Sequence, residues 1–136
     1  MIAAAMGQTK ENALVDEWRA ILDRHARVGC ALTHALEHQH GLGMSEFEVL
    51  ERLAENPGHQ FRVQELAESV HLSQSALSRM IGRLERHGLV GRSLCDNDRR
   101  GIYVCLTEDG RRRHAEALPT QRAVLAATLG SGAAGR

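Results

Sequence analysis

The stretch from residue 61 to residue 110 most constrains the fold, because two helical patterns in it are followed by two short strand patterns. Apolar side chains recur at helical spacing over residues 61–70, and Ser73, a good N-cap residue, begins a second helix that is predicted to end at Gly88. The apolar stripe of this second helix consists of Leu77, Met80, Ile81 and Leu84. Two helices joined by so short a link, followed by a hairpin, predict a DNA-binding unit.

The face of the second helix opposite this stripe has the groups that a helix in a DNA major groove needs. Short hydrogen-bonding side chains stand near its start and guanidinium groups follow. These residues are Ser73, Gln74, Ser75, Ser78, Arg79, Arg83 and Arg86. The plainer interpretation is a solvated helix surface, the usual explanation of exposed charge. The DNA interpretation is favoured because the Ser-rich start, the hairpin and the local positive charge coincide.

Two aliphatic runs, residues 89–94 and 102–106, flank a charged loop and predict a hairpin with a polar tip. Arg99 and Arg100 at the tip are predicted to reach a minor groove, where negative potential attracts guanidinium groups. Asp98 is predicted to hold one of them in an extended pose. The alternative is that Asp98 and Arg100 form an ion pair that only orders the loop.

Charge is unevenly distributed along the chain, although 17 basic and 17 acidic residues give a formal net charge of zero. Residues 1–70 hold six Lys or Arg against eleven Asp or Glu, whereas residues 71–113 hold nine Arg against five acids. The positive field therefore coincides with the predicted DNA-binding unit. A winged helix that binds an acidic protein partner is the competing class, and its binding would not need the steep salt dependence of DNA binding.

These segments resemble the MarR family of winged helix-turn-helix regulators. The run from Asp98 through Arg100 to Leu106 and Thr107 matches the wing signature of that family. The segments 65–67, 72–79, 84–90 and 106–110 also follow the family pattern, so the resemblance covers about residues 42–113. It implies a mainly α (α+β) fold, a winged helix-turn-helix with long N- and C-terminal dimerisation helices.

The resemblance also implies a function: a transcriptional regulator, a repressor and not an enzyme, which binds a palindromic operator in double-stranded DNA as a homodimer and is released by a small-molecule effector or by oxidation. The implied effector pocket lies between the N-terminal helix and the DNA-binding unit, with Trp18, Leu22 and Phe47 as lining residues. Arg62 stands where family members have a Ser or Thr helix cap. It is predicted either to reach a phosphate or to leave the helix start uncapped.

The chain divides into five predicted segments. They are a flexible N-terminus (1–10), an N-terminal dimerisation helix (11–41), the DNA-binding unit (42–107), a C-terminal dimerisation helix (108–129) and a frayed tail (130–136). The N-terminal helix has a longer apolar stripe than one small domain can cover, so part of it is predicted to pack on a second subunit. Pro119 is predicted to kink or interrupt the C-terminal helix, because proline removes a hydrogen bond and clashes with the preceding turn.

Cys30, His34 and His38 are spaced i, i+4, i+8 and share one face of the N-terminal helix. Sulfur and imidazole ligands at this spacing can bind zinc, so a metal-responsive regulator of the same fold is an alternative. The favoured interpretation has no metal and no cofactor, with the histidines on a partly buried dimer helix. Cys30 is interpreted as a buried small residue and not as an oxidation sensor. Three cysteines do not make a disulfide framework, and the absence of a long apolar run or a signal peptide predicts a cytoplasmic protein.

Overall fold

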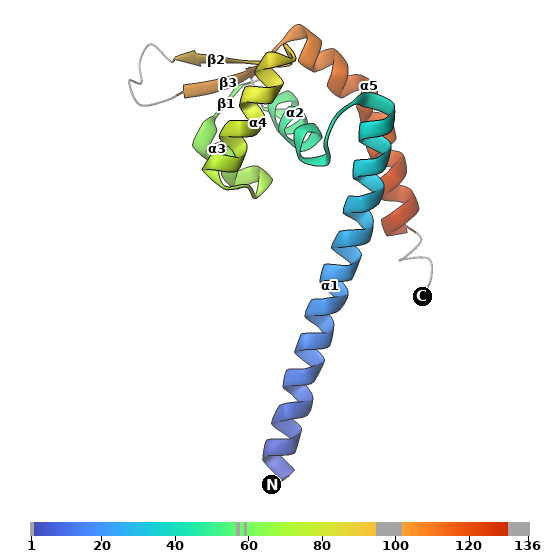
Figure 1. Ribbon diagram of the computed structural model, residues 1–136. Helices are drawn as coiled ribbons and strands as arrows, with labels where there is room; N and C mark the ends of the chain where they lie inside the picture. The colour runs from blue at the N-terminus through green and yellow to red at the C-terminus, as the bar shows by residue number, and fades with distance from the viewer. Residues whose placement is uncertain (1, 57, 59, 95–101, 131–136) are drawn as a thin grey trace.

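The structure, a computed structural model, describes residues 2–56, 58, 60–94 and 102–130. Its elements in chain order are α1 (Ile2–His40), α2 (Met44–Glu55), β1 (Gln60–Arg62), α3 (Val63–Val70), α4 (Gln74–Arg86), β2 (Val90–Leu94), β3 (Ile102–Leu106), α5 (Glu108–Leu125) and a π-helical turn (Ala126–Gly130). The helices dominate and the strands form one small sheet (Figure 1). The predicted mainly helical fold with a winged helix-turn-helix is confirmed.

Helix α1 is a single rod whose N-terminal half stands away from the rest of the molecule (Figure 1). It begins at Ile2 and not at Glu11, so residues 2–10 of the segment that the sequence predicts to be flexible are helical in the structure. The reason is local, because this segment is rich in Ala, Met, Gln and Lys, which favour helix, and it contains no proline. The C-terminal half of α1 lies beside α5 (Figure 1).

The core lies where α2, α3 and α4 pack on one another and on the sheet. Its fully buried large side chains include Phe47, Leu50, Leu53, Leu66, Leu77, Ile81, Leu84 and Val104. All four members of the apolar stripe predicted for α4 are buried, which confirms the stripe. Burial of each such side chain stabilises the fold by about 1.5–3 kcal/mol, and this packing fixes which face of α4 remains outside.

The turn between α3 and α4 has the predicted start and stop signals. His71, in the left-handed conformation (φ 59°), ends α3. Ser73 caps α4, and its Oγ accepts a hydrogen bond from the Ala76 amide at 3.1 Å. Gly88 follows α4 with a φ of 74°, a conformation that favours glycine. The helix-turn-helix is therefore set by local sequence.

The three-stranded sheet contains one strand that the sequence patterns did not predict. The strand order is β1-β3-β2 with antiparallel neighbours, and the β2–β3 pair is the predicted hairpin. Residues 61 and 62, predicted as helix, instead belong to β1, where Phe61 pairs with Val104 and Arg62 with Tyr103. Pairing with a strand about 40 residues away overrides the helical pattern, so α3 begins only at Val63.

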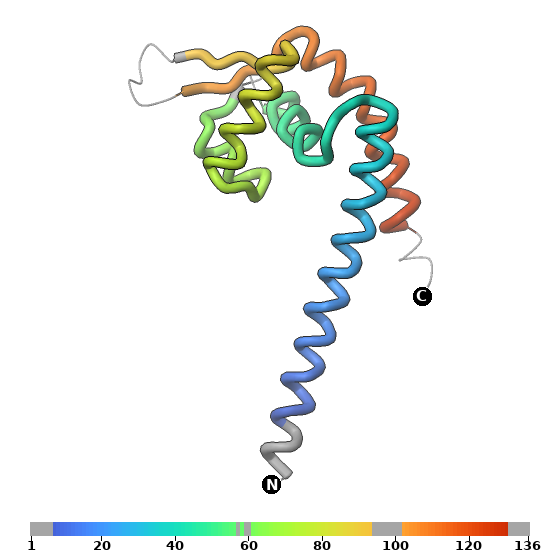
Figure 2. Tube along the Cα trace, in the orientation of Figure 1, coloured from blue at the N-terminus to red at the C-terminus, as the bar shows by residue number. Residues whose placement is uncertain are grey.

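Helix α5 begins at Thr107, whose Oγ1 accepts from the Gly110 amide at 3.0 Å. The Thr107 hydroxyl also donates to the Gly88 carbonyl at 2.6 Å, which ties the start of α5 to the end of α4. The helix continues through Pro119 to Leu125, so the predicted interruption is wrong. The course of α5 nevertheless changes direction along its length (Figure 2). Pro119 is exposed, where water can serve the carbonyl that loses its helical partner.

Within the described residues, no helix is long and apolar enough to cross a membrane.

Candidate nucleic-acid interface

The outer face of α4 is the exposed polar surface that the sequence predicts. Gln74, Ser75 and Ser78 near its start are exposed, as are Arg79, Arg83 and Arg86 further along. Ser73 is exposed as well, but its Oγ is engaged by the Ala76 amide and lies 3.4 Å from the Ser75 Oγ. Ser73 therefore acts first as a helix cap, and Gln74, Ser75 and Ser78 present amide and hydroxyl groups at the surface.

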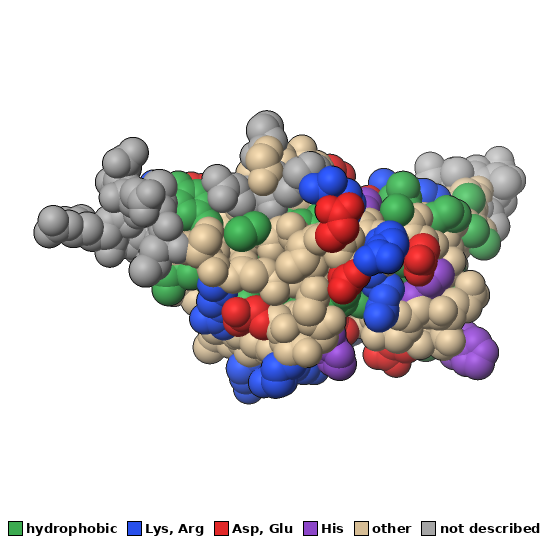
Figure 3. Space-filling model, turned by 90° about the horizontal axis from the view of Figure 1, so that it is seen from above, with side chains coloured by type: hydrophobic (Ala, Val, Ile, Leu, Met, Phe, Trp, Pro, Cys, Tyr) green, Lys and Arg blue, Asp and Glu red, His purple; other side chains and the backbone are tan. Residues whose placement is uncertain are grey.

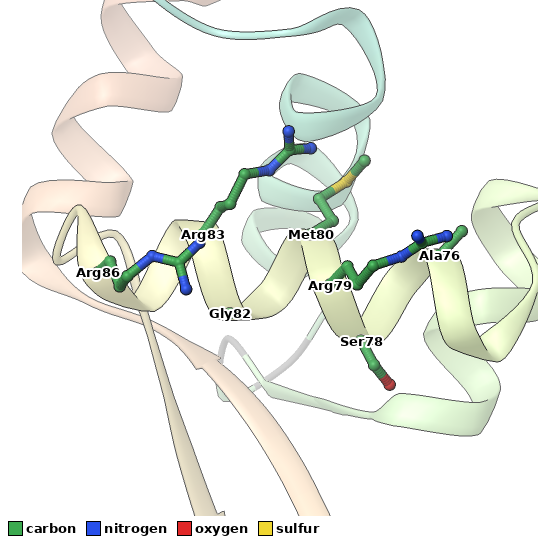
Figure 4. Close-up of a pocket in the computed structure, with 7 residues that line it drawn as sticks. All are labelled: Ala76, Ser78, Arg79, Met80, Gly82, Arg83 and Arg86. Atoms are coloured by element: carbon green, nitrogen blue, oxygen red, sulfur yellow. The ribbon is translucent and has the colours of Figure 1, made fainter.

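A groove of about 650 Å³ runs along α4. Its lining residues are Ala76, Ser78, Arg79, Met80, Gly82, Arg83 and Arg86 (Figure 4). The side chain of Ser78 points away from that of Arg83, so these groups serve opposite edges of the helix (Figure 4). Among the described residues, Arg79, Arg83 and Arg86 have no ion-pair partner. Their positive charge is not compensated within that part of the subunit, which favours an anionic partner.

A second hollow, of about 450 Å³, lies where the starts of α3 and α4 meet the hairpin of β2 and β3, which is the predicted wing. It is lined by Arg62, Val63, Gln64, Gln74, Ser78, Arg92 and Ile102. The structure thus brings together three of the residues predicted to bind DNA, Arg62, Gln74 and Ser78. It adds Arg92, whose Nε lies 2.8 Å from the Glu85 Oε1 on α4. Sequence patterns missed Arg92 because only the packing of β2 against α4 brings it beside Glu85.

Arg62 has two structural roles. It is the N-cap residue of α3 and makes no side-chain cap bond. Its Nε donates to the Tyr103 hydroxyl at 3.2 Å, and its guanidinium lies 5.5 Å from the centre of that ring. A cation over an aromatic face is held in place. The Arg62 side chain is therefore oriented by the wing strand β3.

The wing itself is described only as far as its two strands. The hairpin formed by β2 and β3 projects from the body on the side away from α1 (Figure 1). The predicted minor-groove residues Asp98, Arg99 and Arg100 lie outside the described residues, so their roles stay predictions. Viewed from above, Lys and Arg side chains gather along the lower left edge of the molecule, next to the hairpin (Figure 3).

A buried polar cluster joins α2 of the DNA-binding unit to α5. The Glu51 carboxylate, almost fully buried, is bonded to the Arg122 guanidinium and to the His114 Nε2 at 3.2 Å. The His114 ring also stacks on Phe47, with centroids 5.3 Å apart. Burial alone would raise the pKa of Glu51, but hydrogen bonds from Arg122 and His114 outweigh it and hold that pKa below its ordinary value. The cluster is thus an ionised clamp between the two helices.

The structure does not bring the three predicted effector-pocket residues together. Trp18 and Leu22 are exposed on the projecting half of α1, whereas Phe47 is buried in the core. A hollow of about 410 Å³ does lie between α1 and the start of α2. It is lined by His25, Ala26, Gly29, Cys30, Thr33, His34, Glu37 and Met44. The predicted location between α1 and the DNA-binding unit therefore holds a hollow, but one with different walls.

Cys30 is exposed, so its interpretation as a buried small residue is wrong. The cause is that Cys30 shares a face of α1 with His34 and Glu37, which are exposed as well, so the rest of the subunit does not cover this face. His34 and His38 stack their rings in parallel at 5.9 Å. In the part of the chain that the structure describes, no three side chains of His, Cys, Asp or Glu are grouped closely enough to hold a metal ion.

A capped helix with an exposed basic face, a preceding helix packed against it and a hairpin on its flank define a winged helix-turn-helix protein. A family model described as MarR family matches residues 42–102. AbsC, a MarR family transcriptional regulator from Streptomyces coelicolor, is 33% identical, with 82% of this chain and 75% of that chain covered and a TM-score of 0.78. The protein belongs to the MarR family of transcriptional regulators.

Two further relatives extend this comparison. Sco3205, a MarR family transcriptional regulator from Streptomyces coelicolor whose structure is in complex with DNA, is 28% identical, with 90% of this chain and 75% of that chain covered and a TM-score of 0.81. The HTH-type transcriptional repressor YetL from Bacillus subtilis (strain 168) is 29% identical over 101 residues, which are 72% of this chain. The match spans 60% of the length of YetL.

Proposed function

We propose that this protein is a homodimeric repressor of transcription that binds a palindromic operator, with α4 in the major groove. The observation that carries the proposal is the face of α4, where three arginines without ion-pair partners among the described residues follow a polar helix start. A neutral protein with this local positive field attracts a polyanion to one surface only. The repressor YetL and the DNA complex of Sco3205 support the same function.

The α4 residues divide into two roles in this proposal. Gln74, Ser75 and Ser78 stand at the start of the helix, the end of a recognition helix that contacts base edges. Arg79 and Arg83 contact phosphates or guanine through their guanidinium groups. Arg62, oriented by Tyr103, adds a phosphate contact beside the start of α3.

The wing and the dimer extend the contact along the duplex. Arg99 and Arg100 enter the flanking minor groove, and Asp98 orients one of them. Two copies related by a two-fold axis place their α4 helices on half-sites about 34–36 Å apart, one helical turn of DNA. An operator that is a pseudo-palindrome follows from that symmetry.

Effector control is assigned to the hollow between α1 and α2. Met44 and Ala26 offer apolar contact there, and His25, Thr33 and His34 offer hydrogen bonds. A small organic ligand with an apolar part and a polar group fits such walls. Since α1 is the proposed dimer helix and α2 belongs to the DNA-binding unit, a ligand that prefers one arrangement of the two would change the spacing of the recognition helices.

The test is selection of bound duplexes from a random library, followed by anisotropy titration of the selected site at two salt concentrations. Wild type should select a palindrome and lose affinity steeply with salt. Arg83→Ala should weaken binding about tenfold and lower the salt dependence. Arg112→Ala is the matched control, because Arg112 is exposed on α5 and already paired with Asp109. A library without any enriched sequence would contradict the proposal and favour an acidic protein partner.

A further inference from the structure

A glycine stands in the interior of α4, the proposed recognition helix. Gly82 is the ninth of the 13 residues of this helix. Glycine inside a helix lowers the ratio of folded to unfolded protein about fivefold relative to alanine, because its backbone loses more conformational freedom on folding. The stability of α4 therefore does not explain the glycine at this position.

The described residues give no packing reason for Gly82. Gly88 has a φ of 74°, and Gly110 lies against the Leu89 carbonyl, so both of those positions require glycine. A Cβ at Gly82 would instead have the Arg86 Nη1 as its nearest neighbour, at an ordinary contact distance of 4.0 Å. Some glycines outside α4 are equally unconstrained, so open space alone assigns no role, and the location of Gly82 has to decide.

The location of Gly82 is the groove on α4 (Figure 4). Residues three and four apart are neighbours on a helix surface, so Gly82 lies between Ser78 and Arg79 on one side and Arg86 on the other. Arg79 and Arg86 are exposed and have no ion-pair partner among the described residues. An anionic partner in this groove would therefore meet backbone, and no side chain, at Gly82.

From this position we propose that Gly82 sets the depth at which α4 enters the major groove, because it lets the duplex approach the helix backbone. The proposal rests on the proposed function and adds a positioning residue to it. A helix with its side chains is about 10–12 Å across and the major groove about 12 Å wide, so little room remains.

The size of one methyl group decides whether this position matters. A Cβ at Gly82 would extend the helix surface by roughly 1.5 Å. Hydrogen bonds from protein groups to base edges need distances of about 2.7–3.2 Å. A helix displaced by such a step would lose direct base contacts from Ser78 and Gln74, whereas the long arginine side chains could still follow the phosphates.

Gly82→Ala and Gly82→Met test the proposal, since both fill the space without a change of charge and both favour helix more than glycine does. Thermal melting should show each variant to be at least as stable as wild type. In anisotropy titrations with the selected duplex, affinity should fall about tenfold for Gly82→Ala and about a hundredfold for Gly82→Met.

A duplex of scrambled sequence is the internal reference. Its binding depends mainly on phosphate contacts, so both variants should bind it within about twofold of wild type. Gly7→Ala is the matched control variant. It also removes a glycine from the interior of a helix, and a Cβ at Gly7 would meet nothing within 4 Å. Because Gly7 lies far from α4, this change should leave both affinities unaltered (Figure 1).

The outcomes separate this proposal from the proposed function. Wild-type affinity of Gly82→Met for the selected duplex would overturn the role of Gly82 and leave the proposed function standing. An equal loss of affinity for the selected and the scrambled duplex would also overturn it, because the variants would then disturb phosphate contacts and not the reading of bases. A wild-type protein that selects no duplex would overturn the proposed function and this proposal with it.

Discussion

Glu51 on α2 accepts two hydrogen bonds from the guanidinium of Arg122 on α5, at 2.8 and 3.1 Å. The Glu51 carboxylate is buried and the Arg122 side chain is half-exposed, so the ion pair lies at the edge of the contact between α2 and α5. Removal of the charge would leave Arg122 and His114 with one neutral acceptor oxygen in place of two charged ones. The α2–α5 junction should therefore be sensitive to changes at Glu51.

Glu51→Gln should lower the free energy of unfolding by about 1–3 kcal/mol, because a buried carboxylate loses charge-assisted bonds. Glu48→Gln is the matched control, because Glu48 lies about one helical turn before Glu51 on α2. Burial and the neighbouring Glu51 raise the pKa of Glu48, so removal of its charge should be neutral or stabilising. Urea denaturation of both variants measures the difference. Equal destabilisation by the two changes would contradict the clamp.

The clamp should also make stability depend on pH. The pKa of Glu51 lies below its ordinary value of 4.5 in the folded protein, so its contribution is fully present above that value. The contribution is lost as pH falls through the folded-state pKa, because the unfolded chain then binds the proton more readily. Thermal unfolding between pH 7 and pH 3 should show a shallower acid loss for Glu51→Gln than for wild type. Parallel curves for the two proteins would show that other carboxylates account for the acid loss.

Gly110 should tolerate no side chain. A Cβ at this position in the first turn of α5 would collide with the Leu89 carbonyl, which accepts from the Thr107 amide, and with the Leu106 side chain. Gly110→Ala should therefore destabilise the protein by about 3 kcal/mol, since backbone has to move. Gly91→Ala is the control, because its Cβ would meet nothing within 4 Å. Thermal melting of the two variants decides, and similar melting temperatures would contradict this packing.

Ser73→Ala should remove the cap of α4 and cost about 1 kcal/mol of stability, because the Ala76 amide loses its acceptor. Ser75→Ala, two residues away and also exposed, should leave stability unchanged. In DNA titrations we expect the reverse order, with the larger loss of affinity for Ser75→Ala at a temperature where both variants are folded. Identical stabilities would show that the Ser73 Oγ does not hold the helix start.

Local sequence was sufficient for α4 and for the hairpin. The Ser73 cap, the Gly88 stop and the buried stripe depend on residues within a few positions of one another. Local sequence was insufficient for β1, because this three-residue strand forms by pairing with β3. The sequence patterns also did not predict the cluster of Glu51, His114 and Arg122, because the two partners of Glu51 are 63 and 71 residues away in the chain. The exposure of Cys30 depended on which face of α1 the rest of the subunit covers.

The length of α1 has a mechanical consequence. At about 1.5 Å per residue, its 39 residues make a rod of roughly 58 Å. If two such rods cross near their midpoints in the proposed homodimer, each body sits at the end of an arm of about 30 Å, and a rotation of about 6° at the crossing moves that body by about 3 Å. This is about the rise of one base pair. In the proposed dimer a small rotation between the two rods would therefore be enough to shift the two α4 helices relative to their proposed half-sites.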